Sequence, residues 1–246
     1  MAFATGKRIV EMVHEELTPA RILTEAAFHN AIVTNSAIGG STNAPIHIPA
    51  IARHIGVDLP VETWQESGYE VPLIVNLQPA GEYLGEDYFR AGGVPAVMSE
   101  LLKAGKLRGE ALTVTGKTMA ENLDGKAILD ADVIHPYERP LIGSAGFMVL
   151  NGNLFDAGLL KTSVIGDDFR QKYMQNPDDP NAWEGTAIVF DGPEDYHERI
   201  NDPDLPIDEN CMLFIRNTGP VGYPGSAEVV NMLPPDRLVQ AGIHEL

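Results

Sequence analysis

Apolar residues recur at helical spacing through the first half of the 246-residue chain. In residues 7–17 they form one stripe, as in an amphipathic helix: Ile9, Met12, Val13 and Leu17. The same spacing predicts further helices over residues 20–37, 41–56 and 92–105. In the helix over 41–56 we expect Ser41 or Thr42 as the N-cap and Gly56 at the end, with Pro49 kinking or shortening it.

Short apolar runs bounded by turn residues predict strands in the rest of the chain. The run at 71–77 reads as a buried strand. Beyond residues 135–146, strand-like runs follow at 147–166, 184–192 and 210–217. The first contains a turn signal at Asn151–Gly152, and a short helix is predicted over 193–202, between the last two. We therefore predict an α/β fold with a boundary near residues 130–142, which divides it into a helical part over 1–135 and a β-rich part over 136–246.

Composition narrows the possible functions. The formal net charge is −18, and the 17 Lys and Arg residues are scattered, which argues against binding to nucleic acid. The single cysteine, Cys211, allows no internal disulfide and no cysteine-based metal cluster, and it is expected to be a buried small apolar residue. Because the sequence has neither a signal peptide nor an apolar run that could cross a membrane, a soluble, cytoplasmic protein is expected.

The segment "AIGGSTNAPIH", residues 37–47, is the most pointed motif of the first half. Two glycines lead into Ser41, Thr42 and Asn43 at a helix start, where backbone N–H groups and the helix dipole favour an anion. Two interpretations stay open at this point: a site for a carboxylate or phosphate, or a tight turn with an ordinary N-cap.

A second motif, "GPVGYPGSAEVVNM" at residues 219–232, follows a predicted strand. Its three glycines allow close approach of the backbone and its two prolines stiffen the loop. Glu228 follows where the sequence predicts the start of a helix. One carboxylate held in this way suits Mg²⁺, which needs few protein ligands. A surface loop with a capping glutamate is the equally open alternative.

Other polar clusters favour structural roles. His47 and His54 lie seven residues apart, which is better explained by a helix face than by a metal site. The acids Glu82, Glu86 and Asp87 are expected to be solvated near a helix start, with a cation site as the alternative. The segment 116–118 ends like a phosphate-binding loop, but position 111 lacks the required glycine, which argues against nucleotide binding.

Taken together, these segments resemble the dihydroxy-acid dehydratase and 6-phosphogluconate dehydratase family, and the resemblance covers nearly the whole chain. The matching blocks occur in the expected order: "GKRIVEMV", "AIGGSTNAPIHIPAIARHIGVDL", "EDYFRAGGVPAVMSELLKAG", "LTVTGKTMAEN", "VLNGNLFDAGLLKTSV" and "GPVGYPGSAEVVNM". Pro45, "LQPAGEYLGEDY" and "NPDDPNAWEGTAIVFDGPEDYHERI" resemble the branch that dehydrates sugar acids such as arabinonate and xylonate.

The resemblance implies a dehydratase that converts a sugar acid to a 2-keto-3-deoxy acid, using an iron–sulfur cluster, Mg²⁺ and a serine base. It implies that Glu228 binds the metal and that Ser41, Thr42 and Asn43 belong to the substrate-binding wall. It also implies a barrel-like sheet in the second domain. The family's cluster cysteines have no counterpart here, Cys211 matches none of them, and no catalytic residue is assigned. An internal segment of a longer protein is expected, with the cluster ligands and the catalytic serine outside it.

Two alternative functions stay open: a catalytically inactive remnant that serves as a binding module, and a dihydroxy-acid dehydratase of branched-chain amino-acid synthesis. A segment of a larger protein is expected to expose apolar surface where other parts pack, which promotes self-association. We therefore expect a homo-oligomer with a small-molecule sugar-acid substrate and with neither nucleic acid nor membrane as a partner.

Overall fold

The computed structural model describes residues 2–153, 158–166, 169, 171, 178, 185–217 and 232–244. The chain divides into two compact units, Met1–Ile165 and Gly166–Leu246, and each is described by itself. Helices and strands both occur, which agrees with the predicted α/β class. Within the described residues, no helix combines the length and apolar character needed to cross a membrane.

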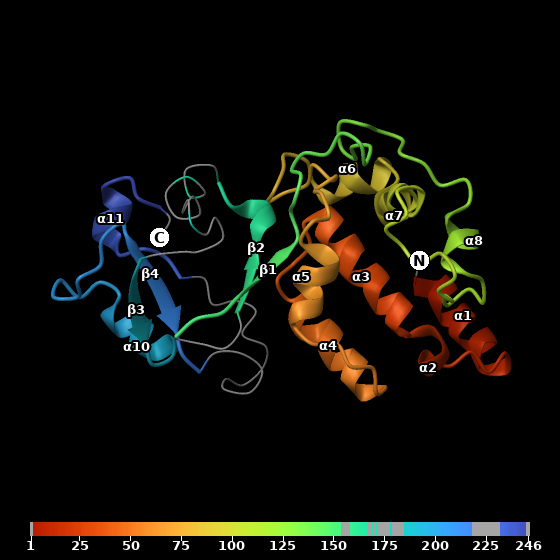
Figure 1. The fold of residues 1–246 in the computed structure, drawn as a ribbon, viewed down its shortest axis with the longest axis horizontal. Helices are drawn as coiled ribbons and strands as arrows, with labels where there is room; N and C mark the ends of the chain where they lie inside the picture. Colours follow the sequence, from red (N-terminus) through yellow and green to blue (C-terminus); the bar gives the residue numbers. More distant parts are fainter. Residues whose placement is uncertain are drawn as a thin grey trace. The chain divides into compact units, whose positions relative to one another are not determined.

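The first unit is mainly helical (Figure 1). Its helices are α1 (Ala2–His14), α2 (Pro19–Ile22), α3 (Glu25–Ile38), α4 (Ala44–His54), α5 (Glu62–Gly68), α6 (Gly85–Arg90), α7 (Gly93–Lys103) and α8 (Met119–Leu123). The predicted helices over 7–17, 41–56 and 92–105 correspond to α1, α4 and α7, with shifted ends. The single helix predicted over 20–37 is instead two, because Thr24 adopts an extended conformation and begins α3 as its N-cap.

The apolar stripe predicted in α1 is wrong in part. Met12 and the following Leu17 are buried, whereas Ile9 is 55% and Val13 71% exposed. Arg8 nevertheless connects α1 to the loop before α8, because its Nε donates a hydrogen bond to the carbonyl of Val114. Glu15 holds the same side chain by an ion pair at 2.6 Å. Apolar spacing thus predicted the helix but not which of its faces would be covered.

The apolar run at 71–77 is buried and extended, as predicted, but it forms isolated bridges rather than a regular strand. Leu73 N–H donates to the carbonyl of Ile142, and Leu141 N–H donates back to Leu73, both at 2.9 Å. Further along, Asn76 N–H donates to the carbonyl of Val133 at 2.9 Å. Residues 133–145 therefore supply many of the segment's backbone partners, and Ala37 at the end of α3 supplies another.

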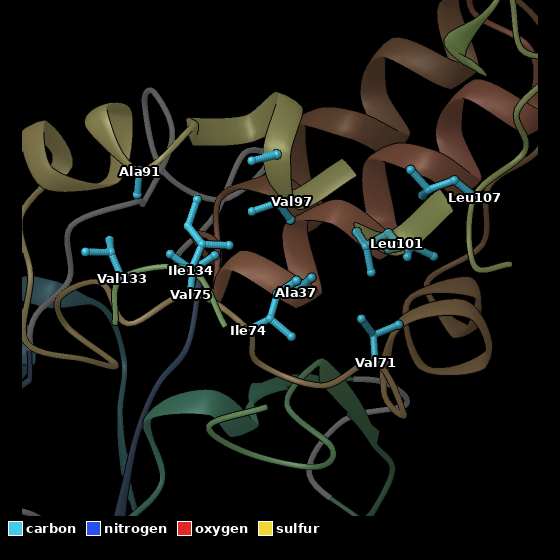
Figure 2. Close-up of a cluster of buried hydrophobic side chains, with 12 residues drawn as sticks. Ala37, Val71, Ile74, Val75, Ala91, Val97, Leu101, Leu107, Val133 and Ile134 are labelled. Carbon is cyan, nitrogen blue, oxygen red and sulfur yellow. The ribbon is translucent and has the colours of Figure 1, made fainter. Parts of the chain in front are cut away.

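Helices α3 and α7 pack with this extended segment around the main apolar cluster, which Figure 2 shows in close-up. The cluster consists of Val33, Ala37, Val71, Ile74, Val75, Ala91, Ala96, Val97, Leu101, Leu107, Val133 and Ile134. A second cluster joins Ile32 of α3, Trp64 of α5 and Phe147, with the two aromatic rings edge to face at 5.4 Å. Helix α3 therefore contributes to both clusters.

Asn30 of α3 fixes the loop that follows α7. Its Nδ2 donates to the carbonyl of Arg108 at 3.0 Å, and its Oδ1 accepts from the N–H of Arg108 at 2.7 Å. Asn30 is only 2% exposed, so both amide atoms depend on these bonds for partners. The loop is held against α3 at this point.

A short antiparallel pair completes the first unit. Strand β1 (Phe147–Leu150) pairs with β2 (Gly158–Lys161), with Phe147 opposite Lys161 and Leu150 opposite Gly158. The strand-like character predicted for 147–166 is confirmed here, although a short 3₁₀ helix, Thr162–Val164, ends the region. Asn151–Gly152 lies in the connection between the strands, which is longer than a two-residue hairpin turn.

The second unit contains a parallel pair, β3 (Thr186–Phe190) and β4 (Cys211–Ile215), connected through α10 (Pro193–Arg199), and then α11 (Asp236–Gln240). Both strands and the helix between them were predicted. Phe190 and Tyr196 form the centre of its apolar cluster, with their rings edge to face at 5.3 Å. The described strands make two two-stranded sheets, so within the described ranges they do not form a closed barrel.

The main cluster allows a matched test of burial. Leu101→Ala removes a fully buried side chain and should lower the free energy of unfolding by about 2–5 kcal/mol. Leu129→Ala makes the same chemical change at a side chain that is 75% exposed and should change it by less than about 0.5 kcal/mol. Urea unfolding followed by circular dichroism measures both; similar losses would contradict the assigned core.

Candidate functional site

The two glycines of the segment 37–47 form the turn between α3 and α4. Gly39 ends α3 in the left-handed conformation, at φ 68°, and its N–H donates to the carbonyl of Ser36. The N–H of Gly40 donates to the carbonyl of Asn35 at 2.8 Å. A Cβ on Gly39 would lie 2.9 Å from Leu73 Cδ1, and one on Gly40 would overlap the Asn35 side chain. The left-handed backbone and Leu73 therefore favour glycine at position 39, whereas a side chain at position 40 would force the Asn35 side chain to move.

The three polar residues that follow occupy the approach to α4. Ser41 and Thr42 are exposed, and Asn43 is partly buried. The N-cap of α4 is Asn43, so the expectation of Ser41 or Thr42 at this position is wrong. The reason is local: Ser41 Oγ accepts the N–H of Asn43 at 3.2 Å and stays within the turn, whereas the Asn43 carbonyl accepts the first helical N–H groups.

Most N–H groups at the start of α4 are already bonded. Ala44 N–H donates to the carbonyl of Ser41 at 3.2 Å, and the N–H groups of Ile46 and His47 donate to the carbonyl of Asn43 at 3.0 Å. Pro45 has no N–H to offer. An anion at this turn would therefore rely on the Ser41 and Thr42 hydroxyls and on the helix dipole, rather than on a row of free amides. Helix α4 continues through Pro49 to His54, so of the two effects expected of Pro49, a kink or a shortening, the shortening does not occur.

Two buried polar atoms flank the turn. Ser163, in the 3₁₀ helix after β2, is 3% exposed, and its Oγ lies 3.5 Å from the position of a Cβ on Gly39. Neither Ser163 Oγ nor Asn35 Nδ2 has a hydrogen-bond partner among the described residues. Sequence reasoning missed both. A polar Lys-Thr-Ser run inside the strand-like region predicted over 147–166 was the available signal for Ser163.

Lys161, two residues before Ser163, adds a titratable group to this segment. Partial burial in β2 lowers the pKa of its amine, because the charged form loses hydration. Between Lys161 and Ser163, the buried Thr162 is bonded: its Oγ1 donates to the carbonyl of Gly146 at 2.7 Å. The segment 161–163 therefore brings an amine and a hydroxyl into the same unit as the turn at 39–43.

The other polar clusters have local roles. Asp87 Oδ2 accepts the N–H of Leu84 at the start of α6, Glu86 pairs with Arg90 at 2.6 Å, and the N–H of Glu82 donates to Asn76 Oδ1. These bonds fit acids near a helix start, as the sequence indicated. Among the residues that the structure describes, no three His, Cys, Asp or Glu side chains are grouped so that they could hold a metal ion.

The segment Gly116–Thr118 is a tight turn before α8. Thr113 N–H donates to the carbonyl of Lys117 at 2.9 Å, and Gly116 has a φ of 79°. Thr118 and Glu121 then form a reciprocal capping box, in which hydrogen bonds from Thr118 lower the pKa of the Glu121 carboxyl. The Lys117 backbone thus closes the turn, and α8 has only five residues.

Cys211 lies in the part of the chain that the structure describes, whereas Glu228 does not. Cys211 is 2% exposed in the apolar cluster of the second unit, as predicted, and burial raises the pKa of its thiol. Glu228 and most of its loop lie outside the described residues, so its assignment as a metal ligand stays a prediction. The assignment of Ser41, Thr42 and Asn43 to a substrate wall also stays a prediction.

Comparison with protein families gives two successive matches. Residues 1–122 match the family described as "Dihydroxy-acid/6-phosphogluconate dehydratase N-terminal", and residues 132–246 match its C-terminal counterpart. Together these matches account for nearly the whole chain.

Individual relatives are similar over the full chain but are much longer. The chain is 56% identical over 246 residues to the D-xylonate dehydratase of Caulobacter vibrioides, and it covers 41% of that protein. It is 45% identical over 247 residues to the L-arabinonate dehydratase of Rhizobium leguminosarum bv. trifolii, again covering 41%. The dihydroxy-acid dehydratase of Ignicoccus hospitalis is 40% identical over 92% of the chain, which covers 39% of that relative. The chain therefore spans about two-fifths of these relatives.

The requirement for glycine at the turn can be tested. Gly39→Ala places a side chain on a left-handed residue that faces Leu73, so it should lower the free energy of unfolding by about 1–2 kcal/mol. Gly85→Ala is the control, because a Cβ there meets open space, and we expect a change of at most about 1 kcal/mol, in the stabilising direction. Urea titration measures both; an unaffected Gly39 variant would contradict this geometry.

Proposed function

The chain belongs to the dihydroxy-acid/6-phosphogluconate dehydratase family, and from this premise we propose that it is part of a sugar-acid dehydratase. The observation that carries the proposal is the 56% identity to a D-xylonate dehydratase along the entire chain, followed by 45% to an L-arabinonate dehydratase. A pentonate is therefore the proposed substrate class. The proposed product is a 2-keto-3-deoxy acid.

The reaction removes water from a 2,3-dihydroxy acid. A base takes the proton from C2, the hydroxyl on C3 leaves as water, and the resulting enol becomes the 2-keto acid after proton transfer. A pentonate carries a carboxylate and several hydroxyls, so its site needs many hydrogen-bonding groups. The exposed hydroxyls of Ser41 and Thr42 and the amide of Asn43 are groups of this kind, and we assign them to the wall that binds the substrate.

Mg²⁺ and an iron–sulfur cluster are the cofactors proposed from the family resemblance. Glu228 is the proposed Mg²⁺ ligand, since a carboxylate delivered by a stiff glycine- and proline-rich loop suits a hard cation with few protein ligands. The cysteine of this chain does not fit a cluster: clusters require several thiolates, whereas Cys211 is single, buried and held as a thiol by its raised pKa. Cluster ligands would have to lie outside these 246 residues.

The wider organisation is proposed on the same basis. Residues 1–135 would belong to the cluster-bearing domain, and residues 136–246 to the beginning of a β-rich domain that closes into a barrel-like sheet in the longer protein. We further propose a cytoplasmic homo-oligomer that acts on a free sugar acid. The division into two domains is supported by the family matches, which change from the N-terminal to the C-terminal domain between residues 122 and 132.

A dihydroxy-acid dehydratase of branched-chain synthesis is the second candidate, because relatives with that name are 37–40% identical. The higher identity to sugar-acid dehydratases favours the first. A hybrid protein separates the two. In it, these 246 residues replace the matching region of the Caulobacter D-xylonate dehydratase.

We expect the hybrid to convert D-xylonate or L-arabinonate to a 2-keto-3-deoxy acid and to leave 2,3-dihydroxyisovalerate largely unchanged. Glu228→Gln should lower kcat at least about 100-fold, as expected for loss of a metal-binding carboxylate. Glu198→Gln, at an exposed position of α10, is the matched control and should keep full activity. Product is measured as the 2-keto acid by chromatography.

Three results would count against the proposal. Turnover of dihydroxyisovalerate alone would favour the branched-chain function. A folded hybrid without turnover of any substrate would favour an inactive remnant. Equal activity of the Glu228 and Glu198 variants would remove Glu228 from the metal site.

A further inference from the structure

A groove of about 490 Å³ opens on the first unit and reaches Ile38, directly before the turn at residues 39–43. One wall is the face of α3 that carries Thr34 and Asn35. A second wall comes from Val94 and Met98 of α7, and a third from Val114 and Met119 beside the loop that precedes α8. The lining is almost entirely apolar.

Two polar atoms without a hydrogen-bond partner among the described residues lie in this lining. Thr34 is 8% exposed, and neither its Oγ1 nor Asn35 Nδ2 has a hydrogen-bond partner within the described ranges. Buried polar atoms in folded proteins nearly always have a hydrogen-bond partner, because without one they lose their hydrogen bonds to water and gain none in return. Nearby Asn30, which also lines the groove, has both amide atoms bonded to Arg108. The side-chain amide of Asn30 therefore has its hydrogen-bond partners within the described residues, whereas Thr34 Oγ1 and Asn35 Nδ2 have none there.

Apolar exposure extends beyond the groove. Val94 is 43% and Val114 52% exposed at its margin. The carbonyl of Val114 accepts a hydrogen bond from Arg8 of α1, and α1 in turn exposes Phe3 by 89% and Val13 by 71%. Exposed valines at the margin of an apolar groove are typical of an area that another polypeptide covers.

The length of the relatives indicates which polypeptide would cover this surface. The chain covers only 41% of the D-xylonate and L-arabinonate dehydratases while matching them from end to end. In proteins of that length, more than half of the polypeptide lies outside the matching region, and it must pack against something. A groove with an apolar lining and two unpaired hydrogen-bonding groups suits a segment of protein core better than a water-soluble sugar acid.

We propose that, in a dehydratase of the relatives' length, this groove is an internal docking surface: it receives an apolar segment of the same polypeptide from outside residues 1–246. The segment also presents an acceptor, such as a backbone carbonyl, to Asn35 Nδ2 and a partner to the Thr34 hydroxyl. The inference rests on family membership and does not depend on the proposed substrate.

The hybrid dehydratase described above tests this by comparing stability in two contexts. Val94→Glu and Val114→Glu place a charge at the groove margin, where both side chains are exposed in the 246-residue chain. We expect no change in Tm in the isolated chain, and a drop of at least about 5 °C in the hybrid, where the charge would be buried. Leu129→Glu, at a 75% exposed leucine that does not line the groove, should leave Tm unchanged in both.

Equal Tm values for the groove and control variants in the hybrid would overturn the proposal, whether or not the hybrid is active. Should the hybrid not fold, the same substitutions are made at the matching positions of the natural D-xylonate dehydratase, with the same expected drop. Peroxide oxidation of Met98 and Met119 supplies an independent readout. We expect both to oxidise at least about 10-fold more slowly in the hybrid or natural protein than in the isolated chain, because covered thioethers react slowly. Oxidation that slows as the isolated chain is concentrated would instead identify a second copy as the occupant.

Discussion

Burial of the extended segment 71–77 constrains most of the first unit, since its backbone groups have no access to water and must find partners inside the protein. Ala37 supplies a carbonyl to Ile74 from the end of α3, and Ile74 accepts in turn from His135. On the other side of the segment, Leu73 exchanges hydrogen bonds with residues 141 and 142. These bonds fix the end of α3 against the segment, so the turn at Gly39 can begin only where Leu73 leaves room for it.

Helix α3 connects this core to the rest of the unit, and both its apolar and its polar residues make the contacts. Ile32 and Val33 enter two different apolar clusters, while Ser36 satisfies its hydroxyl within the helix by donating to the carbonyl of Ile32. Asn30 uses both amide atoms on a neighbouring loop. The polar residues of α3 therefore do not form one face: Asn30 and Ser36 are bonded inside the unit, whereas Thr34 Oγ1 and Asn35 Nδ2 have no partner among the described residues. That is why periodicity predicted the existence of α3 but could not assign its faces.

The predictions from sequence succeeded where one physical signal dominated. Apolar spacing located α1, α4 and α7, and short apolar runs located β1, β3 and β4. They failed where tertiary contacts decided between near-equal local choices. Asn43 rather than Ser41 became the N-cap because the Ser41 hydroxyl found a nearer partner, and Ile9 stayed exposed although it matches the apolar stripe of α1. Ser163 was missed because its proximity to Gly39 joins residues far apart in sequence, which no local pattern records.

The motif at 39–43 consists of a glycine part and a polar part, which have different kinds of support. Gly39 and Gly40 are explained by folding alone: one is left-handed against Leu73, and the other packs on Asn35. These contacts exist whether or not a ligand binds nearby, so the two glycines carry no argument about function. Thr42, by contrast, is an exposed residue. The substrate-binding hypothesis therefore depends on the polar half of the motif, and substitutions of Thr42 that spare the glycines are the ones that can separate binding from folding.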